Sequence, residues 1–411
     1  MTAILLIGTA DTKQDELLFL RDCMQQAGAA VRIMDVGVLE PAAFTPDISN
    51  AQVAAAAATT LADIIASGDE NTAMTKMAEG ATTLAARLHA ASEIDGMIAL
   101  GGSMGTDLAL DVANALPVGM PKFVISTIAF SPLIPAERIA PDVMMILWSG
   151  GLYGLNSVCR AALSQAAGAV VGAAKAVEKP QGARPLIGMS SLGKSCLSYM
   201  VALKPELEKR GYELAVFHTT GMGGRAMEGL ARQGRFACMF DFSLQEISNH
   251  LNGSMVSAGE SRLEGAGAAG IPQIIAPGAI DMIDLACWQP LPDRFNARNY
   301  HAHNRLIASV NMAPEERRAA AKAIAAKLAK AKGPTALLLP LQGIEEWDKP
   351  GAPMHDPDAH ALFCEEIRRT VSPPVALIEI DAHINDAAFA AAALQVFDRW
   401  VAEGKVVKGS V

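Results

Sequence analysis

Four glycine- and hydroxyl-rich segments stand out in this 411-residue chain, because each follows a short apolar run and precedes a helical pattern. They occupy residues 8–13, 101–106, 188–195 and 219–225. A helix N-terminus reached through such a loop presents unpaired backbone N–H groups and the positive end of the helix dipole. Phosphates and carboxylates bind at such places. The four segments are therefore the first candidates for ligand binding.

The first segment directly follows the apolar run at residues 4–7. Thr9 and Thr12 supply hydroxyl groups and Lys13 supplies a positive charge, a combination that suits a phosphate. The alternative is a plain strand-to-helix turn in which Asp11 or Thr12 caps the helix. Asp35 ends the next predicted strand, where it is either a ribose-binding acid or an aspartate of a surface turn.

The second segment, residues 101–106, has two leading glycines that allow a ligand to approach the backbone. Ser103 and Thr106 add hydrogen-bond donors, which favours an anion site. The same letters fit the nucleophile elbow G-x-S-x-G of α/β-hydrolases, with Ser103 as the nucleophile and Asp381 and His383 as partners. A structural tight turn is the third interpretation.

The third segment, residues 188–195, spells the P-loop pattern G-x-x-x-x-G-K-S, and Asp241 could end a Walker B strand. Pro205 lies in the helix that follows, and no switch or arginine-finger signal accompanies the motif. We interpret the match as a coincidence of sequence on a different scaffold. Whether this loop binds phosphate stays open.

The fourth segment is a candidate substrate-binding nest opposite the first two. Its members are Gly221, Gly223 and Gly224, which free the backbone, and Arg225, which can pair with a carboxylate or phosphate. Candidate catalytic residues, without an assigned reaction, are His218, Asp281 and His383. His301 and His303 have a spacing that a metal could use, but no third ligand is near in sequence, so we predict no metal site.

Composition excludes several classes of protein. Half of the residues are apolar and aromatic residues are few, as in α/β proteins. A net charge of −9 argues against a nucleic-acid surface. The six cysteines form no C-x-x-C pair, and the N-terminus lacks a secretory pattern, so we expect a cytoplasmic protein without membrane contact. The small-residue helix at residues 161–174 favours a homodimer or a higher homo-oligomer.

Strand and helix patterns alternate along the whole chain, which predicts parallel sheets covered on both faces. The Pro- and Gly-rich residues 179–185 are the best linker candidate. We therefore predict an α/β protein with two doubly wound, Rossmann-like domains, at residues 1–180 and 185–411. Ligands of such sheets bind beyond the carboxyl ends of the strands.

A series of short sequence motifs, in a fixed order along essentially the whole chain, resembles the motifs of a known family. It includes Gly8-Thr-Ala-Asp-Thr-Lys13, Asp35-Val-Gly37, Met77-Ala-Glu-Gly80, Gly101-Gly-Ser103, Gly223-Gly-Arg-Ala-Met-Glu228, Ser257-Ala-Gly259 and Asp381-Ala-His-Ile-Asn-Asp386. The chain resembles the bacterial and fungal family of uncharacterised two-domain proteins whose sequence is also the N-terminal region of the tomato mosaic virus resistance protein. At Met104 it departs from the glycine usual in that family.

The resemblance implies two Rossmann-like domains with a cleft between them and a site for ATP, with or without magnesium, in the first domain. The implied nucleotide-binding residues are Gly8, Thr9, Asp11, Thr12, Lys13, Gly101, Gly102, Ser103, Gly105, Thr106 and Thr127. It implies no established reaction, so whether the protein is an enzyme stays open.

Three functions follow from these observations. The first is a nucleotide-binding protein that acts on a small carboxylate or a phosphorylated metabolite between the domains. The second is a hydrolase or C–C-cleaving enzyme for a small carbonyl substrate, which uses Ser103 or the pair His218 and His383. The third is a module that senses a metabolite without chemistry.

Overall fold

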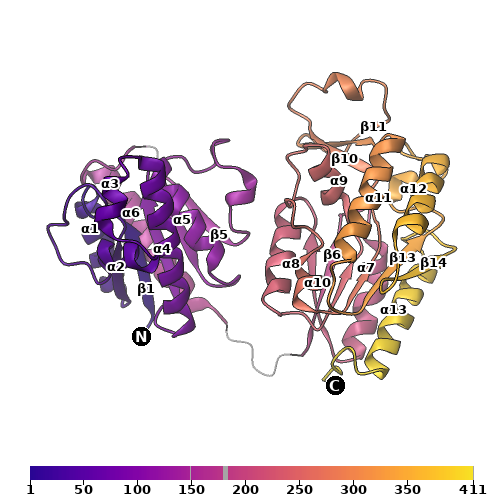
Figure 1. Cartoon of the computed structure of the whole chain (residues 1–411), viewed down its shortest axis with the longest axis horizontal. Helices are drawn as coiled ribbons and strands as arrows, with labels where there is room; N and C mark the ends of the chain where they lie inside the picture. The colour runs from indigo at the N-terminus through magenta and orange to yellow at the C-terminus, as the bar shows by residue number, and fades with distance from the viewer. Residues whose placement is uncertain (149, 179–183, 411) are drawn as a thin grey trace. The chain divides into compact units, whose positions relative to one another are not determined.

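A computed structural model describes residues 1–148, 150–178 and 184–410 of the chain (Figure 1). The chain divides into two compact units, Met1–Lys179 and Pro180–Val411. The predicted linker at residues 179–185 falls largely on residues 179–183, which lie outside the described ranges. Each unit contains its own sheet and its own hydrophobic core.

The first unit is built on a five-stranded parallel sheet in the order β2-β1-β3-β4-β5. Its strands are β1 (Ala3–Gly8), β2 (Ala30–Asp35), β3 (Gly96–Gly101), β4 (Lys122–Ser126) and β5 (Val143–Leu147). Its helices are α1 (Gln14–Gln26), α2 (Asn50–Ala56), α3 (Leu61–Ala66), α4 (Glu70–Ala90), α5 (Ser103–Ala115) and α6 (Ser157–Ala176). Helices cover both faces, which is why β1 and β3 consist almost entirely of apolar residues.

The two faces of this sheet have separate cores. Ile4 and Leu6 of β1 face the core formed with α1 and α6, whereas Leu5 and Ile7 face the core formed with α2, α4 and α5. Such alternation is the normal geometry of a strand. Since α1 follows β1 on one face and α5 follows β3 on the other, the neighbouring strands β1 and β3 form the topological switch point of the sheet. Doubly wound sheets bind their ligands at this point.

The second unit has a six-stranded parallel sheet in the order β14-β13-β9-β8-β6-β7. Its strands are β6 (Leu186–Ser191), β7 (Glu213–His218), β8 (Cys238–Asp241), β9 (Gln273–Ile275), β13 (Thr335–Pro340) and β14 (Ala376–Ile380). Its helices are α7 (Ser198–Lys209), α8 (Met222–Arg232), α9 (Gln245–Leu251), α10 (Gly265–Ala269), α11 (Pro314–Leu328), α12 (Pro357–Thr370) and α13 (Ala387–Ala402).

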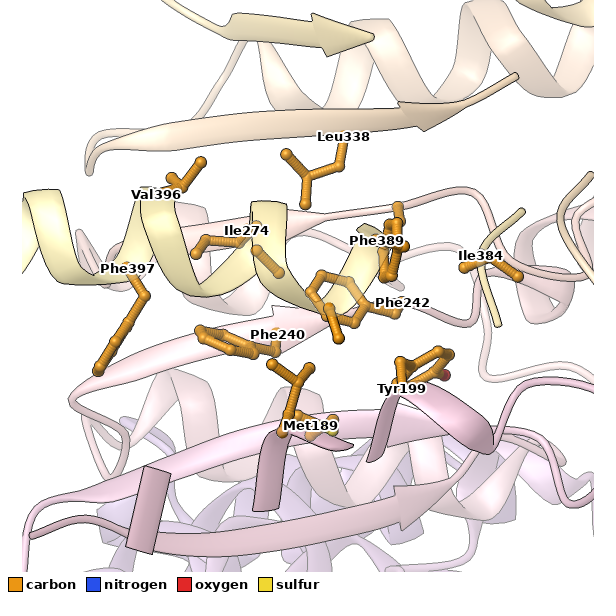
Figure 2. Packing of buried hydrophobic residues seen from close by; sticks show 14 of the residues in the cluster. Met189, Tyr199, Phe240, Phe242, Ile274, Leu338, Ile384, Phe389, Val396 and Phe397 are labelled. Carbon is orange, nitrogen blue, oxygen red and sulfur yellow. The ribbon is translucent and has the colours of Figure 1, made fainter. Parts of the chain in front are cut away.

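Aromatic side chains concentrate in the core on the α7 and α13 face of this second sheet (Figure 2). The ring of Phe242 packs edge-on against both Tyr199 and Phe389, with centroids 5.3 and 5.1 Å apart. Phe240 makes the same kind of contact with Phe397 at 5.4 Å. These pairs link β8 and the residue that follows it, Phe242, to α7 and α13.

The predicted fold class is confirmed, with one addition. The second unit also contains a three-stranded antiparallel sheet in the order β10-β12-β11. Its strands are β10 (Met282–Ala286), β11 (Tyr300–Ala302) and β12 (Ile307–Asn311). The sequence pattern missed it because two of its strands lie in a stretch rich in Pro, Asn and Arg that reads as a loop.

Helix α6 contains the apolar stretch that the sequence singled out. One face of it packs on α1 and the sheet through Leu163, Val170 and Val171, and the other face is exposed. Across the described ranges, no helix combines the length and apolarity needed to cross a bilayer.

Two helix glycines of the first unit provide a matched stability test. A Cβ atom at Gly80 of α4 would lie 1.9 Å from the carbonyl oxygen of Val53 in α2, whereas a Cβ atom at Gly168 of α6 meets no atom within 4 Å. We predict that Gly80→Ala lowers the free energy of unfolding by about 1–3 kcal/mol through overpacking. Gly168→Ala should raise it by about 0.5–1 kcal/mol through helix propensity. Urea unfolding followed by circular dichroism measures both, and equal effects would contradict the close α2–α4 contact.

Candidate functional site

A pocket of about 320 Å³ lies in the first unit at the switch point between β1 and β3. The loops that follow these two strands contribute most of its polar lining, and apolar residues of β1, β3, α5, the β2 loop and α4 contribute most of the remainder. Its predicted members are Gly8, Thr9, Asp11, Thr12, Lys13, Gly101, Gly102, Ser103 and Gly105. The structure thus brings the first two glycine segments of the sequence together.

The loop after β1 is held in shape by buried hydrogen bonds. Asp35, at the end of β2, accepts the backbone N–H groups of Ala10 and Gly37, each at 2.9 Å. Burial raises the pKa of Asp35, and the two N–H donors partly counter that rise. Its side chain is only 2% exposed, so the interpretation as a surface-turn aspartate was wrong. Because the Oδ1 atom of Asp35 accepts both N–H groups, Asp35 holds the loop after β1 in position.

The loop after β3 depends on close backbone packing. A Cβ atom at Gly101 would lie 2.6 Å from the Cα atom of Gly105, so a side chain there would push the first turn of α5 out of place. Helix α5 begins after Gly102 and has no side-chain cap. Helix α1 begins after Lys13, also without a side-chain cap. Two helix N-termini with uncapped N–H groups therefore border one pocket, an arrangement suited to anions.

The charged groups of this pocket are few and differ in their surroundings. The ammonium group of Lys13 lies 5.1 Å from the ring centre of Tyr153 and donates to the carbonyl of Thr12. Asp11 accepts the N–H of Leu39 through one carboxylate oxygen, whereas its other oxygen is buried without a hydrogen-bond partner among the described residues. The site therefore offers one cation, two helix N-termini, the unsatisfied carboxylate oxygen of Asp11 and the exposed carboxylate of Glu70.

Two predicted nucleotide-binding residues lie outside the lining. The hydroxyl of Thr106 pairs with that of Ser126 at 2.7 Å and is buried. Thr127 donates its backbone N–H to the carbonyl of Gly101 and so supports the loop from behind. Met104 does line the pocket, and its side chain remains 44% exposed.

The sequence argument missed the apolar part of the lining. Met74 and Met77 of α4 contribute to it, together with Val36, Val38 and Leu39 after β2. A helix placed between β2 and β3 could have been expected to pass over the switch point. The apolar positions of α4 nevertheless look like any buried helix face, so the sequence carried no separate signal for a ligand.

Residues 188–195, which match the P-loop sequence pattern, do not form a P-loop. Gly188 lies inside β6, where a Cβ atom would meet the sulfur of Met239 at 2.7 Å. Helix α7 begins only at Ser198, and the Ser195 hydroxyl is buried 3.4 Å from a carboxylate oxygen of Glu345. Asp241, the Walker B candidate, is bound by Arg262 and by the hydroxyl of Ser190. The sequence matches the P-loop pattern, but the backbone at Gly188 and the Asp241 carboxylate are both part of the packed interior of the second unit.

The predicted nest at residues 219–225 already holds an anion, and that anion belongs to the chain itself. One carboxylate oxygen of Glu246 accepts the N–H groups of Gly221, at 2.6 Å, and Gly224, at 3.2 Å. The other oxygen binds Arg262 at 2.7 Å. A Cβ atom at Gly224 would lie 1.9 Å from Glu246, so glycine is needed to admit the carboxylate. The nest therefore anchors α8 to α9.

Two of the candidate catalytic residues meet in a pocket of the second unit. Asp281 and His383 both line a cavity of about 510 Å³ beside the loops that follow β13 and β14. The Nδ1 atom of His383 accepts the N–H of Asn385, so its Nε2 atom carries the hydrogen and donates to the carbonyl of Glu345 and to Asp348 at 2.9 and 3.0 Å. Both ring nitrogens are thus engaged, and His383 positions Asp348.

The remaining histidines take other places. His218 ends β7 and lies outside the described lining of both pockets. His301 and His303 stack on Trp347 with centroids 4.6 and 4.1 Å apart, and burial lowers the pKa of His303 to about 4. The two imidazoles therefore form part of an aromatic cluster with Trp347.

The fold and its pockets define a two-unit α/β protein in which each unit has a pocket at the edge of its parallel sheet. Residues 2–179 match the N-terminal domain of the Uncharacterised protein family (UPF0261), and residues 184–401 match the C-terminal domain of that family. The chain belongs to this family.

Its relatives align over nearly the full chain. A UPF0261 protein of Brucella melitensis is 59% identical over 408 residues, which cover 99% of this chain and 98% of the relative. A UPF0261 protein of Clostridium tetani is 35% identical and covers 95% and 96%. The ToMV resistance protein Tm-1(GCR237) of Solanum lycopersicum is 29% identical over 95% of this chain but only 55% of its own length.

Solved structures are similar only in a general way. UDP-GlcNAc 2-epimerase of Methanocaldococcus jannaschii matches with 7% identity and a TM-score of 0.22, over 67% of this chain and 83% of the epimerase. ADP-heptose lps heptosyltransferase II of E. coli matches with 12% identity and a TM-score of 0.20, over 68% and 85%. Likenesses this slight do not bear on function.

Glu345, beside the second pocket, gives the protein a specific pH dependence. Burial and the neighbouring Asp281 charge raise the pKa of Glu345 from 4.5 to about 9. Between about pH 4.5 and 9 the folded protein therefore keeps a proton on Glu345 that the unfolded chain releases. The binding of this proton stabilises the folded state; the stabilisation is full below pH 4.5 and is lost as the pH rises toward 9. We predict that Glu345→Gln flattens the decline of unfolding free energy between pH 6 and 9.

Urea titrations followed by tryptophan emission at several pH values measure that decline. The control is Glu346→Gln, because Glu346 is a neighbouring exposed carboxylate paired with Lys349 at 2.8 Å. It should leave the slope of the wild-type protein unchanged. Parallel slopes for the wild-type protein and Glu345→Gln would show that Glu345 is ionised in the folded state.

Proposed function

We propose that the first unit binds a nucleotide, ATP with magnesium, in the pocket at the switch point of its sheet. The observation that carries the proposal is the convergence of two uncapped helix N-termini, those of α1 and α5, on one pocket. Phosphate oxygens are the ligands that such N–H groups bind best. Lys13 adds a positive charge at the same edge of the pocket.

The apolar part of the pocket suits the base of the nucleotide. Met74 and Met77 contribute apolar, polarisable surface to the lining, and Val38 adds to its apolar part. A flat aromatic base would bury this surface while its phosphates reach the helix ends. The combination of apolar and polar lining in this pocket therefore matches a molecule with the same two parts.

Asp11 fits a role beside magnesium. Its unpartnered carboxylate oxygen is buried in the pocket wall next to the proposed phosphate position. Magnesium prefers carboxylate, phosphate and water oxygens and keeps several of its waters. Asp11 would hold the ion through one of these waters or directly, and the ion would offset the phosphate charge.

The hydrolase hypothesis gains no support from the site. Ser103 does begin a helix after a strand, as a nucleophile elbow requires, but no histidine is among the described residues that line its pocket. His383, its proposed partner, has both ring nitrogens engaged in the second unit. Two roles are open to the proposed nucleotide: a reaction on a small carboxylate or phosphorylated metabolite, and ligand sensing without chemistry.

The test compares two lysines that lie at the C-terminal ends of glycine-rich segments, Lys13 as the last residue of its segment and Lys194 as the last but one. ATP with magnesium should raise the melting temperature of the wild-type chain, because a ligand that binds only the folded state stabilises it. Lys13→Ala should weaken ATP binding by about tenfold to a hundredfold, the loss expected for one charge-assisted contact. Lys194→Ala removes the exposed lysine of the P-loop spelling and should leave affinity unchanged.

Thermal unfolding with increasing ATP, and isothermal titration calorimetry for the dissociation constants, provide the measurements. A loss of ATP binding in Lys194→Ala, with normal binding in Lys13→Ala, would move the site to the second unit. An unchanged melting temperature of the wild-type chain at millimolar ATP would refute nucleotide binding.

A further inference from the structure

The pocket of the second unit, which the proposed function does not use, contains two buried polar atoms without partners. Asp281 is 2% exposed and His360 is 9% exposed, and both line the 510 Å³ cavity. Among the described residues, neither the Oδ1 atom of Asp281 nor the Nδ1 atom of His360 has a hydrogen-bond partner. A buried polar atom left unpaired costs free energy, so two in one cavity point to a ligand that pairs them.

Both unpaired atoms are hydrogen-bond acceptors. The Nε2 atom of His360 lies 3.0 Å from the carbonyl oxygen of Pro340, and since a carbonyl can only accept, Nε2 carries the hydrogen. Burial lowers the pKa of His360, which keeps the ring neutral and leaves Nδ1 with a free lone pair. Asp281 presents a carboxylate oxygen. The missing partner must therefore bring donors.

The other polar side chains that line the cavity are already engaged. Asp348 accepts from His383 through one oxygen and from the N–H groups of Ile344 and Glu345 through the other. Gly343, with φ at +126°, lets the loop close on this pair, because a Cβ atom would lie 2.6 Å from Asp348. The hydrogen-bonding groups of Asp348, His383 and this loop are paired with one another, so they shape the cavity wall and leave the ligand to other residues.

The cations near the cavity also have partners. Lys349 pairs with Glu346 at 2.8 Å, and Arg368 pairs with Glu379 at 2.6 Å. Arg317, buried behind the lining, lies 3.6 Å from the second oxygen of Asp281, and its Nη2 atom has no hydrogen-bond partner among the described residues, so it faces Asp281 as an ion pair only. The lining itself carries more carboxylates than cations, namely Asp281, Asp348, Asp356 and Asp386 against Lys349 and Arg368. An anionic ligand would meet this excess of negative charge.

We propose that this cavity binds a small molecule through a primary ammonium group placed between Asp281 and His360. An ammonium group has three N–H donors, so a single group can satisfy the carboxylate oxygen and the imidazole nitrogen together. Its charge complements the acidic lining, and its hydrogen bond to Asp281 is of the strong, charge-assisted kind. A neutral hydroxyl has one donor and would leave one acceptor unpaired.

The experiment uses the full chain and pairs of probes that differ only in the donor group. Isothermal titration calorimetry at pH 7.5 compares 1,4-diaminobutane with 1,4-butanediol, and ethanolamine with ethylene glycol. We expect saturable binding of the two amines and at least tenfold weaker binding of the two diols.

Three variants locate the site. Asp281→Asn removes the charge, and His360→Gln keeps a donor near the position of Nε2 while it removes the Nδ1 acceptor. Each should weaken binding of 1,4-diaminobutane by about tenfold or more. Asp358→Asn is the matched control, because Asp358 is an exposed carboxylate on the same helix as His360 and lies outside the lining.

His360→Gln keeps the test valid if Asp281→Asn fails to fold beside the buried Arg317. Equal affinity for the diamine and the diol would overturn the proposal in favour of a hydroxyl site. So would an equal loss of binding in Asp358→Asn, which would mark the effect as general charge attraction. The absence of amine binding to the wild-type chain at millimolar concentration would overturn it as well.

Discussion

Backbone N–H groups at the carboxyl edge of a parallel sheet need acceptors, and this requirement organises both units. Strand-to-helix loops and helix N-termini leave these groups without partners inside their own elements. The chain supplies many of the acceptors itself. Asp35 binds the N–H groups of Ala10 and Gly37, Glu246 those of Gly221 and Gly224, and Asp348 those of Ile344 and Glu345. Each carboxylate ties one loop to a neighbouring element.

Within the first unit, the N-termini of α1 and α5 are exceptions to this pattern. Both are 13-residue helices that begin at the switch point, and neither has a side-chain cap. Elsewhere in the first unit, Ser49, Asp69 and Asn156 cap the helices that follow them. A cap in place of Gly102 or Lys13 would occupy the N–H groups that border the pocket. The missing caps are the local feature that makes this edge of the sheet available to an external anion.

The sequence predicted the fold class because the signal is repeated many times. Apolar runs such as residues 4–7 and 97–100, each followed by glycine and a helix, recur in both units. The structure also places most of the predicted nucleotide-binding residues around one pocket, because loops after neighbouring parallel strands must meet at one edge. The short antiparallel sheet around Tyr300–Ala302 was missed, since three residues of strand carry almost no pattern.

The sequence could not tell which anion a nest would hold. Gly221 and Gly224 look like ligand-binding glycines, and the physical reason is sound, but the anion is Glu246, some 20 residues further along the chain. In the same way, Asp281 and His383 were picked for their position after strands, yet only the packed structure separates their roles. His383 is saturated with hydrogen bonds, whereas His360, which drew no attention in the sequence, keeps a free nitrogen.

The two pockets also differ in the hydrogen-bond donors and acceptors that they leave without partners. In the first unit, helix N-termini and Lys13 offer donors beside the carboxylates of Asp11 and Glu70, and the proposed nucleotide would bring acceptors to these donors. In the second unit, paired cations and the unpaired atoms of Asp281 and His360 leave acceptors in excess, and the completing ligand must bring donors. One nucleotide cannot satisfy both, because its phosphates suit only the first. The two proposed ligands are therefore chemically different, and a function that engages both pockets would bring an anion and a cation to one chain.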